Sequence, residues 1–96
     1  MDPIIIKLQK PIQTPEGETL TEMEVRRPTG AEMWKLDKLN ASKPTYRDFV
    51  EIVSVCQHLP LSTVKEMDGA DIVAVANELW NFLAGSLLTG GNFGGN

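Results

Sequence analysis

The spacing of apolar residues changes once along the chain, and this change most constrains the fold. Before Arg27, apolar and polar residues alternate, which is typical of a strand with one buried face. After Thr29, apolar residues recur every three or four positions, as on one face of a helix. Pro28 separates the two patterns. The sequence therefore predicts an α+β fold in which strands occupy the chain up to about residue 27 and helices follow.

The first part of the chain has the pattern of a β-hairpin over residues 3–27. Two alternating runs flank the segment TPEGE, residues 14–18, in which Pro15 supplies a fixed φ and Gly17 tolerates a positive φ. A two-stranded hairpin alone is marginally stable in water. We therefore expect it to pack on the helices or to pair through an edge with another chain.

Two segments carry the signature of a capping box at a helix start. Thr29 is followed three residues later by Glu32, and Thr45 is followed in the same way by Asp48. The first helix is predicted over about residues 30–39. The second should begin after Thr45 and stop near His58, before a proline.

The last third of the chain predicts a short helical turn beginning at Ser62 or Thr63, and then a long helix. Asp68 is the expected N-cap of this helix, with Asp71 at its third position. Its apolar stripe is wide enough for either a buried central helix or an oligomer interface. The stripe contains Ile72, Val75, Ala76, Leu79, Phe82 and Leu83, and Val73 and Trp80 extend it.

Length and composition favour one small domain over residues 1–89, with three to four helices between residues 30 and 88. Residues 90–96 are rich in Gly and Asn and are expected to form a flexible tail. The net charge is −4, and Arg26 and Arg27 are the only adjacent basic residues, which argues against a nucleic-acid surface. No apolar run suits a membrane span or a secretion signal, so we expect a cytosolic protein without membrane contact.

The acidic residues around the start of the long helix are better explained by capping than by catalysis or metal binding. Glu66, Asp68 and Asp71 complement the positive end of a helix. His58 is separated from them by a proline, and the chain has no second histidine. Cys56, the single cysteine, falls on an apolar stripe and is expected to be a small buried hydrophobe. We therefore expect no catalytic site, cofactor or metal, and a binding or assembly role.

Several apolar residues are candidate contacts with a partner or a second copy. The two tryptophans suit either the core or an interface anchor. Phe93 is either a docking anchor or part of the flexible tail. The candidates are Trp34, Leu79, Trp80, Leu83 and Phe93.

The order of these segments resembles the tail assembly chaperones of contractile-tailed phages and prophages, which include the small chaperones of phage Mu and phage P2. The resemblance covers about residues 4–83. It rests on the strand-to-helix junction EVRRPTGAEM and on the later stretch from LPLSTVKEMDGAD to the end of the long helix. The matching positions are Val25, Arg27, Pro28, Thr29, Leu59, Pro60, Val64, Met67, Asp71, Val75, Phe82 and Leu83; the capping residues Glu32 and Asp68 belong to the same stretches.

The resemblance implies a non-enzymatic protein that holds the apolar, helical tape-measure protein in the bacterial host cytoplasm during tail assembly. Such a chaperone leaves as the tube polymerises and is absent from the mature virion. Self-association is expected, as is a longer form made by programmed ribosomal frameshifting, for which the glycine-rich end would be a flexible join. The alternative is a small adaptor or regulatory protein-binding domain of the same architecture, and an enzyme is a distant third.

Overall fold

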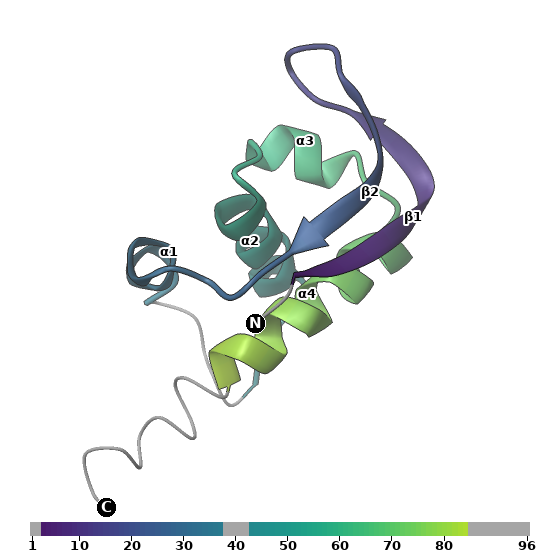
Figure 1. The fold of residues 1–96 in the computed structure, drawn as a ribbon. Coiled ribbons are helices and arrows are strands. Elements are labelled where there is room, and N and C mark those ends of the chain that lie inside the picture. Colours follow the sequence, from purple (N-terminus) through teal and green to yellow (C-terminus); the bar gives the residue numbers. More distant parts are fainter. Residues whose placement is uncertain (1–2, 38–42, 85–96) are drawn as a thin grey trace, which may run out of the picture.

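In a computed structural model that describes residues 3–37 and 43–84, the chain is a small α+β domain (Figure 1). An antiparallel hairpin is followed by four helices within these residues. The predicted fold class is confirmed. The strands are β1 (Ile4–Gln13) and β2 (Thr19–Val25), and the helices are α1 (Gly30–Lys35), α2 (Tyr46–Gln57), α3 (Leu61–Lys65) and α4 (Gly69–Ala84).

The hairpin turns where the sequence predicts. The N–H of Gly17 donates to the carbonyl oxygen of Thr14 at 2.9 Å, and Gly17 has a φ of 88°, a value that suits a residue without a side chain. Ile4 pairs with Val25 and Ile6 with Met23, but the register shifts between Lys7 and Ile12. The strand pairing is therefore interrupted in the middle of β1.

The core lies between the inner face of the hairpin and the helices α2, α3 and α4. In Figure 1 the hairpin lies beside α2 and α4, while α1 stands to one side of them. Both strands contact α4, and α2 packs most extensively against α4. The largest fully buried apolar side chains are Val25, Ile52, Val53, Val64, Ile72, Val75 and Leu79. The wide stripe of α4 is thus largely core.

Two helix boundaries differ from the prediction. Helix α1 ends at Lys35, because the Leu36 N–H is shared between the carbonyl oxygens of Glu32 and Met33, which tightens the last turn. Helix α3 starts at Leu61, because Pro60 has a φ of −61° and its carbonyl oxygen accepts from both Thr63 and Val64. The predicted end of the long helix beyond residue 84, and the tail at residues 90–96, lie outside the described residues.

Helix α2 ends at Gln57, near His58 as predicted, and His58 has a backbone conformation usually taken by glycine. His58 has a φ of 57° and is the helix C-cap. The Leu59 N–H reaches back to the carbonyl oxygen of Ser54 at 3.0 Å, and the Ser54 hydroxyl donates to the carbonyl oxygen of Leu59 at 2.6 Å. These bonds fix the left-handed backbone and set the position from which the imidazole leaves the helix.

Candidate functional site

The junction between β2 and α1 is built on the predicted capping box. The Thr29 N–H donates to Oε1 of Glu32 at 2.8 Å, and the Glu32 N–H donates to Oγ1 of Thr29 at 3.2 Å. Both hydrogen bonds are local, and they fix the direction in which α1 leaves the hairpin. Pro28 is buried immediately before the cap. Thr45 and Asp48 form the second predicted capping box in the same way.

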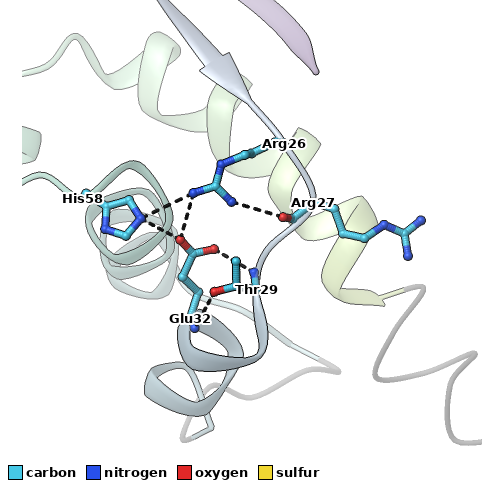
Figure 2. Close-up of polar contacts among 5 residues, drawn as sticks. All are labelled: Arg26, Arg27, Thr29, Glu32 and His58. Atoms are coloured by element: carbon cyan, nitrogen blue, oxygen red, sulfur yellow. Dashed lines mark hydrogen bonds and ion pairs between the residues drawn. The ribbon is translucent and has the colours of Figure 1, made fainter. Parts of the chain in front are cut away.

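Glu32 on α1 also contacts the residue after β2 and, from farther along the chain, the end of α2 (Figure 2). Its Oε2 lies 2.7 Å from Nε2 of His58, at the end of α2, and 3.3 Å from Nη2 of Arg26, just after β2. Nη2 of Arg26 is also 3.5 Å from Nε2 of His58. Nε2 of His58 and Nη2 of Arg26 both donate to Oε2 of Glu32, so these two nitrogen atoms are donors that share one acceptor. We call Arg26, Glu32 and His58 the junction cluster.

The charge of Glu32 follows from these neighbours. Burial by itself would raise the pKa of the carboxyl, but the Thr29 N–H, the Arg26 guanidinium and the His58 imidazole outweigh it and lower the pKa below its usual value. Glu32 is therefore ionised at neutral pH. The side chains of Arg26 and His58 are 46% and 66% exposed to solvent, so each contact with Glu32 contributes at most about 1 kcal/mol.

The state of the Cys56 thiol does not support a catalytic interpretation of this region. Cys56 and His58 line the same hollow of about 270 Å³ beside β2. Burial, reinforced by the charge of Glu32, raises the pKa of the Cys56 thiol to about 12, so it is not a thiolate at neutral pH. The predicted role of Cys56 as a small buried hydrophobe is confirmed.

Asp68 and Asp71, the two aspartates at the start of α4, have different roles. Asp68 caps the helix as predicted, because its Oδ2 accepts from the Ala70 N–H at 3.1 Å. The carboxylate of Asp71 instead accepts from strand β1, with Oδ1 2.9 Å from the N–H of Gln9 and Oδ2 3.1 Å from the N–H of Lys10. Capping of α4 is thus not the main role of Asp71. It satisfies two strand N–H groups where the hairpin register shifts.

The candidate contact residues divide by burial. Trp34 on α1 is 82% exposed, whereas Trp80 is partly buried against the core. Leu79 is fully buried, so it is a core residue and is not available to a partner. Leu83 lies in α4, but its side chain and all of Phe93 are outside the described residues. Among the three candidates whose side chains the structure describes, Trp34 has the most accessible surface.

The positions that carry the family resemblance converge in space. The Arg27 guanidinium, at the strand-to-helix junction, lies 5.9 Å from the centre of the Phe82 ring near the end of α4. This distance is within the range of a cation–π contact. Leu59 is half-buried and packs against the core, and Pro60 is the N-cap of α3. The two sequence stretches thus belong to one packed unit.

Neither a metal site nor a membrane-spanning helix is present among the described residues. Among residues 3–37 and 43–84, no three His, Cys, Asp or Glu side chains gather as a metal site would require. No helix within those ranges has the length and apolarity needed to span a membrane.

Comparison with protein families gives a match over most of the chain. Residues 5–84 match the model of the phage tail assembly chaperone proteins described as "E, or 41 or 14". The chain belongs to this family. The match covers the hairpin and all four helices, so the whole described fold of this tail assembly chaperone is the family's domain. Searches of curated proteins and of solved structures gave no significant match.

Sequence reasoning missed the junction cluster and the strand contact of Asp71. Both join residues that are far apart along the chain: 32 positions separate Arg26 from His58, and 62 separate Gln9 from Asp71. The only sequence signal was indirect, since Arg26, Glu32 and His58 each lie at the boundary of a predicted element.

Proposed function

We propose that this tail assembly chaperone binds the tape-measure protein while the phage tail is built and is released before the virion is complete. Membership of the family over residues 5–84 is the observation that carries the proposal. The proposed role is binding without catalysis, in the cytoplasm of the bacterial host. Self-association, and a longer form joined through the glycine-rich end, belong to the same proposal.

The contact surface that we propose is centred on Trp34. A tryptophan that is 82% exposed leaves a large apolar ring in water, and its burial against a partner would be favourable. Helix α1 holds the backbone of Trp34 in place, because the capping box and the junction cluster fix the start of the helix. Trp80 can add only its exposed part, since the rest packs against the core.

Co-expression with the tape-measure gene of the same phage tests the proposal. We expect the tape-measure protein to be soluble with the wild-type chain and to aggregate without it. Trp34→Ala should abolish this effect without destabilising the chain, because the side chain is exposed. Val73→Ala, at an exposed apolar residue of α4, is the matched control.

Two results would contradict the proposal in different ways. Aggregation of the tape-measure protein even with the wild-type chain would refute client binding. Full solubility with Trp34→Ala would refute the proposed contact surface and leave client binding in place.

A further inference from the structure

A second surface, separate from Trp34, has the features of a docking groove. Helices α2 and α3 enclose a hollow of about 410 Å³ lined by Tyr46, Arg47, Val50, Glu51, Leu61 and Lys65. This volume lies at the lower end of the range for ligand pockets, about 300–1,000 Å³. We call it the α2–α3 groove. It has room for one or two large apolar side chains.

The lining residues are arranged in rows along the helices. Tyr46 and Val50 are four positions apart on α2, and Leu61 and Lys65 are four apart on α3, so each pair follows one face of its helix. Tyr46 is 53% exposed and Leu61 is 45% exposed, while Val50 is buried. The groove therefore has an apolar floor between two exposed apolar walls.

Charge at the groove favours an acidic occupant. Arg47 and Lys65 lie on its rim with one carboxylate, Glu51. Within the described part of the chain, none of these three groups has a hydrogen bond or an ion pair, so the two cations are not used to hold the fold. The chain as a whole carries a net charge of −4, which would repel an acidic partner elsewhere. The groove supplies a local surplus of positive charge beside apolar surface.

We propose that the α2–α3 groove binds a helical segment of the client that presents one or two large apolar side chains flanked by Asp or Glu. This inference rests on the proposed function and assigns the client a second contact, with a stated chemistry. An amphipathic helix that places its apolar face in a groove is a common mode of peptide recognition. The apolar anchors would supply most of the affinity, and the charges would orient the helix.

The experiment uses the full chain and labelled 25-residue peptides that together cover the tape-measure protein of the same phage. Fluorescence anisotropy measures the affinity for each peptide. The peptides that bind should be those with an apolar stripe flanked by acidic residues, and their binding should weaken as salt is raised. Leu61→Ser should lower the affinity at least about tenfold, equal to about 1.4 kcal/mol. Lys65→Gln, which removes an exposed charge, should lower it about three- to fivefold at low salt.

Matched controls separate the groove from general surface effects. Val73→Ser removes an exposed apolar side chain from α4, and Lys7→Gln removes a positive charge from β1. Both should change the affinity less than twofold. Reversal of the charge on both partners is the strictest control. Lys65→Glu should no longer bind the acidic peptide, but it should bind a version of that peptide in which the flanking acidic residues are changed to Lys.

Three other outcomes would contradict the proposed occupant of the groove. Wild-type affinity of Leu61→Ser and Lys65→Gln for every peptide would overturn the groove assignment, while capture of the intact tape-measure protein by the wild-type chain would leave the proposed function standing. Loss of self-association in the groove variants, with peptide binding unchanged, would assign the groove to a second copy. A tenfold gain in peptide affinity after removal of residues 85–96 would assign it to the chain's own C-terminal segment. Both of these results overturn the inference.

Discussion

Replacing Asp71 with Asn tests whether one carboxylate joins α4 to the hairpin. Asp71 is 2% exposed, and its two oxygens accept from the N–H groups of Gln9 and Lys10 at 2.9 and 3.1 Å. The amide of Asn keeps one acceptor but points an NH₂ group at the second N–H. A hydrogen bond to a charged group contributes about 1.5–3 kcal/mol, and water at the partly exposed strand replaces part of it. We therefore expect Asp71→Asn to lower the free energy of unfolding by about 1–2 kcal/mol.

Asp68 offers a matched control three residues earlier. Asp68→Asn makes the same chemical change at the N-cap of the same helix, where Asn caps nearly as well as Asp. This variant should lose less than about 1 kcal/mol, mainly from the weaker interaction with the helix dipole. Asp71→Ala, which removes both acceptors, should cost about 2–4 kcal/mol.

Urea unfolding followed by circular dichroism measures these differences. Amide hydrogen exchange adds a local readout, because Gln9 and Lys10 should lose protection in both Asp71 variants and keep it in Asp68→Asn. If Asp71→Asn cost no more than Asp68→Asn, the carboxylate would be acting as an ordinary first-turn acid and the proposed link to β1 would be refuted.

Three further predictions follow from burial and charge. The pKa of Glu32 is lower in the folded chain than in the unfolded chain, so its stabilising contribution is present above the usual glutamate pKa of about 4.3 and is lost as pH falls through the lower folded value. Glu32→Gln should therefore show a smaller fall in urea midpoint between pH 7 and pH 3 than wild type, and an equal fall would contradict this. The Cys56 thiol should react with a disulfide reagent only as fast as the chain unfolds, and rapid reaction of the folded chain would disprove its burial. Leu79→Ala should cost about 2–5 kcal/mol in urea unfolding, and Trp34→Ala less than about 0.5 kcal/mol; equal costs would contradict their assigned positions.

The elements that could be predicted from sequence depend on interactions within a few residues. The change of apolar spacing at Pro28, the turn at Gly17 and the capping boxes at Thr29 and Thr45 are local, and the structure has all of them. The predicted end of α1 was wrong, because the shared hydrogen bond of the Leu36 N–H ends the helix. The sequence does not show this, since Leu36 is apolar whether it continues the helix or caps it.

The candidate site was harder to predict because its contacts are long-range. Asp71 has the position of a capping residue, and only the path of β1 shows that its acceptors go to another element. Trp34 and Leu79 both fit an apolar helical stripe, yet one is largely exposed and the other fully buried. Which apolar residues face a partner depends on how the helices pack, and the spacing along one helix does not contain that information.

We propose above all that the exposed ring of Trp34 touches the tape-measure protein during assembly. Site-specific photo-crosslinking tests it most directly: the photoreactive amino acid p-benzoylphenylalanine is placed at position 34, and cells assembling the phage are irradiated. The control places the same group at position 16, in the hairpin turn. We expect a crosslink to the tape-measure protein from position 34 and none from position 16, with the chain absent from purified virions. A crosslink from neither position, or equal crosslinks from both, would contradict it.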